Sequence, residues 1–124
     1  MPTFVIHEHH ATRLHWDFRL ERNGVLVSWA VPKGVPTEPG VKRLAVQVED
    51  HPLDYGSFEG EIPEGQYGAG KVMIWDHGTY SEEEWSKTKI VFTLHGEKCA
   101  GTYTMIVTKD RNWLIWKKTE GKKS

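Results

Sequence analysis

Short segments rich in Val, Ile, Thr and Trp recur along this chain between Gly- and Pro-containing turns, and in several of them hydrophobic and polar residues alternate with a period of two. This pattern predicts β-strands rather than helices. The first such segments are 3–7, 14–21, 25–31 and 43–50, and Asn23-Gly24 between two of them is typical of a type I′ hairpin turn. Four further strands are expected within 71–80, 88–96, 101–108 and 112–118. About eight strands with short connections predict an all-β fold, either a barrel or a sandwich.

Three segments interrupt this pattern. Residues 32–40 are a loop by their Pro and Gly content, and residues 51–70 form a longer, Gly-rich connection. A long connection in a compact protein is more often functional than incidental. Ser81 is followed three residues later by Glu84, which is the pattern of a helix cap, so we expect one short helical turn there.

The composition fits one domain spanning residues 1–124. Hydrophobic residues make up 38% of the chain and include six Trp, so a dense core can form. Cys99 has no cysteine partner within the chain, and no segment has the apolar length of a membrane span or the pattern of a signal peptide. We therefore expect a cytoplasmic protein with no membrane partner.

The charge of the chain limits how it could bind nucleic acid. Its formal net charge is −1, which excludes the strong positive field of a non-specific DNA-coating protein. Phosphate binding would therefore need a local cluster of cations or a metal ion. Residues 118–124 are basic and are expected to form a flexible tail.

The strand expected at 14–21 has one apolar and one charged face. The apolar face is a candidate core stripe made of Leu14, Trp16, Phe18 and Leu20. The other face carries His15, Asp17, Arg19 and Glu21. A His and an Asp two residues apart on one face can reach a single metal ion, and Arg19 beside them is suited to bind an oxyanion through two hydrogen bonds.

A third metal ligand could come from the preceding segment, which contains His7, His9 and His10. Alternation sends His7 and His9 to one side of an extended chain and His10 to the other. Two His and one carboxylate with open positions suit Mn²⁺, Fe²⁺, Co²⁺ or Zn²⁺, and ligand type alone does not choose among them.

The strand at 43–50 repeats the division into two faces. Alternation predicts that Leu44, Val46 and Val48 form its apolar face. Arg43, Ala45, Gln47, Glu49 and His51 share the other face. Arg43 and His51 could supply positive charge to a phosphate, and Tyr55 follows in the long connection. A surface ion pair for Arg43 and a core position for Tyr55 are the alternatives.

Four segments are similar to the successive signature blocks of the 3′-phosphoesterase domain family of bacterial DNA ligase D. They are HEHHATRLHWDFRLE at 7–21, VSWAVPKG at 27–34, the block from KRLAVQVEDHPLDY to KVMIWD at 42–76, and LHGEKCAGTYTMIVTKDRNWLIWKK at 94–118. The resemblance implies a compact β-barrel with its active site in a surface groove. It also implies a divalent metal, commonly Mn²⁺, with Zn²⁺ or Co²⁺ as alternatives.

The activity that the resemblance implies is processing of DNA 3′ ends. A terminal 3′-phosphate would be removed to leave the 3′-hydroxyl needed in repair by non-homologous end joining, and some members first remove a 3′-terminal ribonucleoside. The implied metal ligands are His9, His15 and Asp17. The other implied site residues, of which all but the two glutamates would contact phosphate, are Arg19, Glu21, Lys33, Arg43, Glu49, His51 and Tyr55.

The resemblance leaves several roles open. His51 would either stabilise the phosphate or protonate the leaving oxygen, and water is the simplest nucleophile. His7 stands where the family typically has Gln, so it would either contact the metal or form a hydrogen bond. The family's N-terminal arm is not seen ahead of His9, which weakens the expectation of ribonucleoside removal more than that of phosphate removal. A stand-alone member would need a separate ligase as its partner.

Two other functions fit the pattern of residues. A non-haem iron oxygenase would use His15 and Asp17 with His77 or His95 as the third ligand. A non-catalytic module that captures phosphorylated nucleic-acid ends would need the cations but no metal with open coordination.

Overall fold

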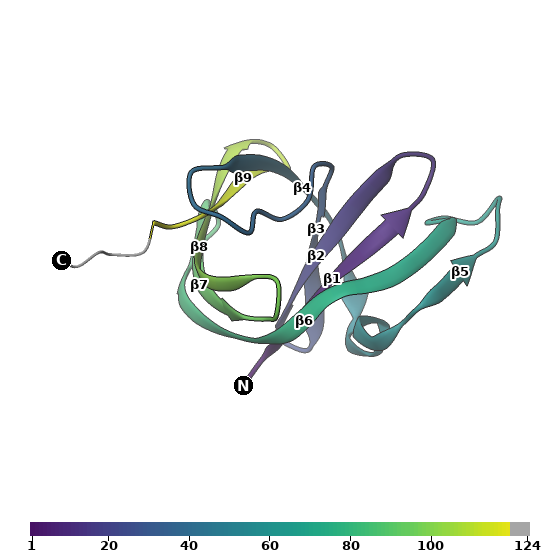
Figure 1. The fold of residues 1–124 in the computed structure, drawn as a ribbon, viewed down its shortest axis with the longest axis horizontal. Helices are drawn as coiled ribbons and strands as arrows, with labels where there is room; N and C mark the ends of the chain where they lie inside the picture. Colours follow the sequence, from purple (N-terminus) through teal and green to yellow (C-terminus); the bar gives the residue numbers. More distant parts are fainter. Residues whose placement is uncertain (120–124) are drawn as a thin grey trace.

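The computed structural model describes residues 1–119, most of which lie in antiparallel strands (Figure 1). The strands are β1 (Thr3–His10), β2 (Leu14–Arg22), β3 (Val25–Val31), β4 (Lys42–Pro52), β5 (Gly60–Ile62), β6 (Gly70–Trp85), β7 (Lys89–His95), β8 (Ala100–Lys109) and β9 (Asn112–Lys117). One 3₁₀ helix, η1 (Leu53–Ser57), follows β4. The predicted all-β class is confirmed. Residues 120–124 of the expected basic tail lie outside the described residues.

Eight of these strands form a closed barrel. The order β1-β2-β3-β4-β9-β8-β7-β6 returns to β1 through a direct β1–β6 pairing, and β5 is added at the free edge of β6. The long strand β6 pairs with β1 and β5 over its first half and with β7 over its second half, as Figure 1 shows. A barrel rather than a sandwich is therefore the observed architecture.

The hairpin between β2 and β3 turns where the sequence predicts. Asn23 and Gly24 have φ angles of 55° and 83°, and a type I′ turn requires positive φ at both positions. This turn fixes the register in which Asp17 lies opposite Ala30 and Arg19 opposite Ser28.

The prediction of a helical turn at 81–84 is wrong. These residues continue β6, and Ser81 and Glu82 pair with Thr93 and Phe92 of β7. A bulge after Glu82 adjusts the register, and Glu83 accepts a hydrogen bond from Thr93 Oγ1. Pairing with a neighbouring strand therefore outweighs the local capping pattern. The one helical turn among the described residues is η1, in the segment expected to be irregular.

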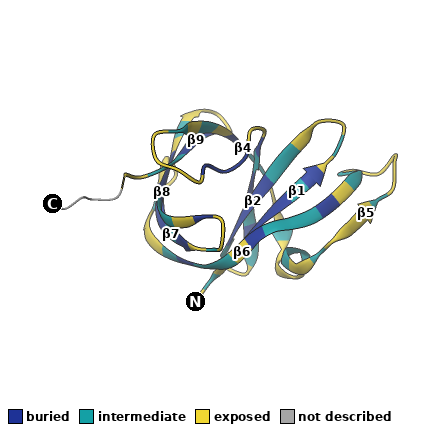
Figure 2. Ribbon diagram, in the orientation of Figure 1, coloured by how far each residue is buried: buried dark blue, intermediate teal, exposed yellow. Residues whose placement is uncertain are grey.

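Inward-facing side chains fill the barrel, and Figure 2 shows the resulting alternation of buried and exposed positions. Phe18 and Leu20 of the predicted stripe are fully buried, but Leu14 is 44% exposed because it lies at the start of β2, beyond the packed interior. In β4 the predicted phase is wrong. Ala45 is fully buried whereas Leu44 is 42% exposed.

The inversion in β4 follows from the large side chains next to it. Ala45 lies opposite Trp113 of β9, and Trp113 packs edge-on against Trp29 with ring centroids 5.8 Å apart. A small residue fits beside two indoles. Gln47 also faces inward, and its Oε1 accepts a hydrogen bond from Trp113 Nε1 over 3.2 Å.

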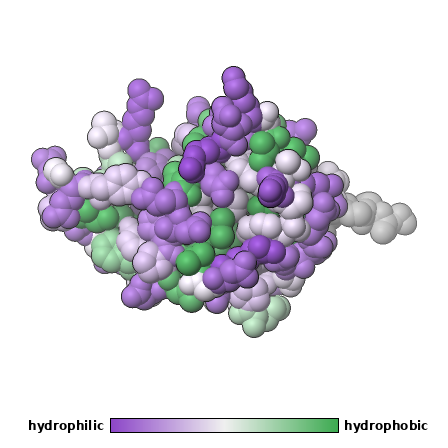
Figure 3. All heavy atoms as spheres, turned by 180° about the vertical axis from the view of Figure 1, so that it is seen from behind, coloured by the Kyte–Doolittle hydropathy of each residue, from purple (hydrophilic) through white to green (hydrophobic). Residues whose placement is uncertain are grey.

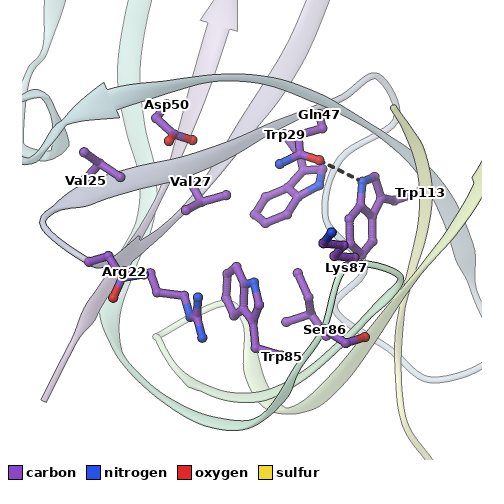
Figure 4. A pocket seen from close by; sticks show the side chains of 12 residues that line it. Arg22, Val25, Val27, Trp29, Gln47, Asp50, Trp85, Ser86, Lys87 and Trp113 are labelled. Atoms are coloured by element: carbon purple, nitrogen blue, oxygen red, sulfur yellow. Dashed lines mark hydrogen bonds between the residues drawn. The ribbon is translucent and has the colours of Figure 1, made fainter. Parts of the chain in front are cut away.

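These tryptophans also line a pocket of about 600 Å³ (Figure 4). Trp85 forms another part of its wall, with the Arg22 guanidinium 4.3 Å from the ring centroid. On the face shown in Figure 3, polar and apolar residues are interspersed. Within residues 1–119, no helix is long and apolar enough to cross a membrane.

Candidate metal and phosphate site

The outer face of β1 and β2 carries a row of polar side chains that the barrel register brings together. His9 lies directly opposite His15, and His7 lies opposite Asp17. Directly paired residues point to the same side of a sheet, so this face gathers all four side chains. The segment between β4 and β6 contributes the other wall of a groove of about 800 Å³.

Three of the groove residues can hold a divalent metal ion. His9, His15 and Asp17 each offer one ligand atom, and these atoms lie within 4.8 Å of one another. His9 Nδ1 is 3.4 Å from Asp17 Oδ2, and His15 Nε2 is 3.2 Å from Asp17 Oδ1. His10 points elsewhere and pairs with Glu8 over 2.7 Å.

The second nitrogen of each candidate histidine ligand is held by backbone oxygens. His9 Nε2 lies 2.9 Å from the Gly68 carbonyl and 3.1 Å from that of Ala69, and His15 Nδ1 lies 3.1 Å from the Arg13 carbonyl. A carbonyl only accepts, so these nitrogens carry the protons. His9 Nδ1 and His15 Nε2 face the Asp17 carboxylate, and in the neutral imidazoles these two nitrogens are the ones that can bind a cation, as expected of histidine ligands.

Electrostatics keep the carboxylate of this set ionised. Burial alone would raise the pKa of Asp17, but the hydrogen bond from His15 and the charge of Arg19 hold it below its usual value. The hydrogen bond with Asp17 in turn raises the pKa of His15. The site is therefore prepared to neutralise a cation.

Arg19 is buried beneath the groove, and most of its N–H groups contact neighbouring side chains. Its Nε donates to His7 Nδ1 over 3.1 Å, and its Nη1 donates to Ser28 Oγ over 2.9 Å. Nη1 also lies 3.1 Å from His51 Nδ1, and Nη2 lies 3.4 Å from Asp17 Oδ2. Three of its five N–H groups thus have hydrogen-bond partners among the described residues, and Nη2 forms an ion pair with Asp17. The predicted contact of Arg19 with an oxyanion through two hydrogen bonds would depend on its Nη2 group, and it stays a prediction.

His7 does not join the metal set; it supports Arg19. Because Arg19 can only donate, His7 Nδ1 accepts, and His7 Nε2 donates to the Phe58 carbonyl over 3.1 Å. Burial, and then the charge of Arg19, lowers the pKa of His7 to about 4. The imidazole is therefore neutral and links β2 to the segment after η1.

His51 and Tyr55 complete the groove beside Arg19. Burial, and then Arg19, lowers the pKa of His51, so it too is neutral near pH 7. Its ring lies 5.0 Å from that of Tyr55, and the Arg19 guanidinium lies 4.9 Å from the Tyr55 ring centroid. Burial raises the pKa of Tyr55, which keeps the phenol protonated.

Comparison with known proteins identifies the family of this chain. Residues 7–107 match the family model described as the DNA Ligase D 3′-phosphoesterase domain. This chain belongs to that family. It is 55% identical over 116 residues to the multifunctional non-homologous end joining protein LigD of Mycobacterium bovis, and 50% identical over 127 residues to that of Pseudomonas aeruginosa. These alignments cover 90% and 95% of this chain but only 15% of each relative, so the chain spans a small part of their length.

The 3′-phosphoesterase fold does not bring every predicted site residue into the groove. Lys33 and Arg43 do not line it, and Arg43 Nη1 instead donates to the carbonyls of Lys33 and Gly34. Glu21 accepts hydrogen bonds from the backbone and hydroxyl of Thr3. Glu49 is exposed on β4, two residues before His51. Roles for these four residues stay predictions.

Sequence reasoning missed several groups that position the site. Ser28 is fully buried, and its hydroxyl accepts a hydrogen bond from Arg19 Nη1. It is the one hydroxyl-bearing residue in an otherwise apolar strand, and this could have marked it as a residue with a polar partner. The carbonyls of Phe58, Gly68 and Ala69 give no such signal, because any residue supplies a carbonyl. The histidines of the oxygenase alternative, His77 and His95, belong to neither the candidate metal set nor the groove lining found among residues 1–119.

Proposed function

We propose that this protein is a divalent-metal-dependent hydrolase that removes the terminal phosphate from DNA 3′ ends and leaves a 3′-hydroxyl for repair. One observation supports this most strongly: the candidate metal ligands share a groove with Arg19, His51 and Tyr55. Membership of a 3′-phosphoesterase family supports the type of bond that is cleaved.

The metal would be held by His9, His15 and Asp17, whose free nitrogen and carboxylate atoms suit Mn²⁺, with Zn²⁺ and Co²⁺ as alternatives. A divalent cation in such a site supplies a Lewis acid for a phosphate oxygen. The carbonyls that hold His9 and His15 would keep both rings in place while substrate exchanges.

The neighbouring side chains would bind and orient the phosphate. Arg19 supplies a fixed positive charge. His51 Nδ1 lies 3.1 Å from both Arg19 Nη1 and the Glu49 carbonyl, and in the neutral tautomer that accepts from Arg19 the Nε2–H group would be a donor to a phosphate oxygen. We favour this role over protonation of the leaving oxygen, because the lowered pKa of His51 leaves little imidazolium near neutral pH. Tyr55 donates a further hydrogen bond, and water is the nucleophile. Lys33 and Arg43 would add longer-range positive charge.

The wider role is proposed from the relatives. Their names state non-homologous end joining, and we propose that this chain prepares ends in the cytoplasm for a ligase in the same process. Removal of a 3′-terminal ribonucleoside is proposed as a second activity.

An end-processing assay tests this function. A primer–template with a 3′-phosphate and one with a 3′-terminal ribonucleoside are incubated with the protein, with Mn²⁺ or with a chelator, beside the His15→Ala variant. Metal-dependent release of phosphate by the wild-type protein alone is the expected result. Tight binding without release in several divalent metals would instead indicate an end-capturing module, and decarboxylation of 2-oxoglutarate would indicate an oxygenase.

A further inference from the structure

One wall of the groove is apolar and carries an exposed aromatic side chain. Ile62, Tyr67 and Ala69 line the groove together with the candidate metal ligands. Tyr67 is 78% exposed, although large aromatic side chains are otherwise mostly buried in this protein. A solvent-exposed ring next to a candidate phosphate site is a surface on which a flat ligand can stack.

The backbone that carries Tyr67 is held by two consecutive turns. The amide of Gln66 donates to the Pro63 carbonyl over 3.3 Å, and the amide of Ala69 donates to the Gln66 carbonyl over 3.1 Å. Gly68 has a φ of 77°, and a Cβ there would lie 3.8 Å from Ile62 Cδ1. These hydrogen bonds constrain the backbone on both sides of Tyr67, close to Ile62 of the apolar wall.

The same turns hold a metal ligand. The carbonyls of Gly68 and Ala69, immediately after Tyr67, receive the proton of His9 Nε2. A group that rests on Tyr67 is thus positioned by the segment that orients His9. Because Tyr67 and His9 are connected through this segment, the distance between a group stacked on Tyr67 and a group bound at the metal ligands is defined by the protein.

We propose that Tyr67 is the stacking platform for the nucleobase of the terminal nucleotide, whose 3′-phosphate is bound beside His9, His15 and Asp17. This inference rests on the proposed function and names the part of the substrate that the apolar wall recognises. Base and 3′-phosphate are joined through one sugar, so a single groove can hold both. Every base has a flat face, so the subsite accepts all four bases and rejects an end that lacks one.

The test compares two 3′-phosphorylated oligonucleotides that differ only at the terminal residue, one with a normal nucleotide and one with a tetrahydrofuran abasic analogue. Stacking on an aromatic side chain corresponds to roughly 10- to 100-fold in binding. The wild-type protein should therefore prefer the base-bearing end by about that factor in kcat/KM, mainly through KM. Tyr67→Ala should reduce this ratio to near one, and Tyr67→Phe should keep it.

Ile106→Ala, which truncates an exposed apolar residue on β8, is the matched control and should keep the wild-type ratio. Metal content is measured for every variant, because it would fall if Tyr67→Ala only disordered the segment that holds His9. A Tyr67→Ala variant that keeps the wild-type ratio overturns the proposal, and so does an equal loss on both substrates. If the wild-type protein releases phosphate from neither oligonucleotide, the proposed function itself has failed.

Discussion

Arg19 Nε donates to His7 Nδ1 over 3.1 Å, and both side chains are buried. His7→Leu keeps a similar size but removes the acceptor, and it leaves a charged donor unpaired at a cost of about 1–3 kcal/mol. His7→Gln can accept from Arg19 through its oxygen and donate to the Phe58 carbonyl through its amide. We expect the Leu variant to lose at least about tenfold in kcat for phosphate release, with the metal still bound, and the Gln variant to keep most activity.

Chemical denaturation, metal titration and steady-state kinetics on the two variants separate the possible roles of His7. A direct role as a metal ligand would appear as weakened metal binding in His7→Leu. Wild-type kcat in that variant would contradict the view that His7 positions Arg19.

The lowered pKa of His7 also makes stability depend on pH. The unfolded chain takes up a proton on this imidazole near its ordinary pKa of 6.5, whereas the folded chain does so only near a pKa of about 4. Acid therefore favours the unfolded state, and stability is lost progressively as the pH falls through this window. Between pH 7.5 and pH 5 the contribution of this group should decrease by about 2 kcal/mol.

The contribution of His7 is isolated by comparison with His7→Gln, which has no titrating group at this position. Denaturant midpoints of both proteins are measured at the two pH values without metal. The wild-type protein should lose more stability on acidification than the variant does, and equal losses would show that the folded imidazole is not held neutral.

Metal binding should depend on the three predicted ligands and on no other histidine tested. Loss of an outer hydrogen-bond partner typically weakens metal binding 10- to 100-fold, so loss of a ligand itself in His15→Ala or Asp17→Ala should weaken it further. His95→Ala, at an exposed position outside the groove, is the control and should bind metal like the wild-type protein. Titration calorimetry with Mn²⁺ gives the affinities. Full affinity in His15→Ala would disprove this assignment.

Local alternation predicted two of the candidate metal ligands, and the family resemblance was needed to choose His9 as the third. A period of two places His15 and Asp17 on one face whatever the barrel does around them, and the register that adds His9 comes from a neighbouring strand joined by a short turn. The same local reasoning failed for β4, where packing against residues distant in sequence determines which side chains face inward. Ala45 faces inward because Trp113 lies opposite it, 68 residues further along the chain.

The environment of Arg19 shows what the sequence could not supply. Its partners come from four segments, and two of them, His7 and His51, look like phosphate or metal ligands when only the sequence is read. Which donor meets which acceptor is set by the barrel register and by the closure of β1 onto β6. The positive charge of Arg19 near the groove could therefore be predicted, whereas the number of its N–H groups that remain available to a ligand could not.

Gly70 marks the point where the long connection meets β1, and this contact excludes any side chain. It has a φ of 119°, and a Cβ there would lie 2.2 Å from the His10 carbonyl oxygen and 2.9 Å from its carbon. Gly70→Ala must displace the end of β1 next to His9, so we expect it to lower both stability and Mn²⁺ affinity. Gly65 is the matched control, because its φ is 88° but nothing lies within 4 Å of its Cβ position.

Gly65→Ala should lose only the roughly 1–2 kcal/mol that a left-handed backbone costs an ordinary residue, with metal affinity unchanged. Denaturation and Mn²⁺ titration of both variants distinguish strain from displacement. If the end of β1 moves, the effect of Gly70→Ala on Mn²⁺ affinity should greatly exceed that of Gly65→Ala. Equal effects in the two variants would mean that backbone conformation alone matters, and that the contact between Gly70 and His10 does not hold His9 in place.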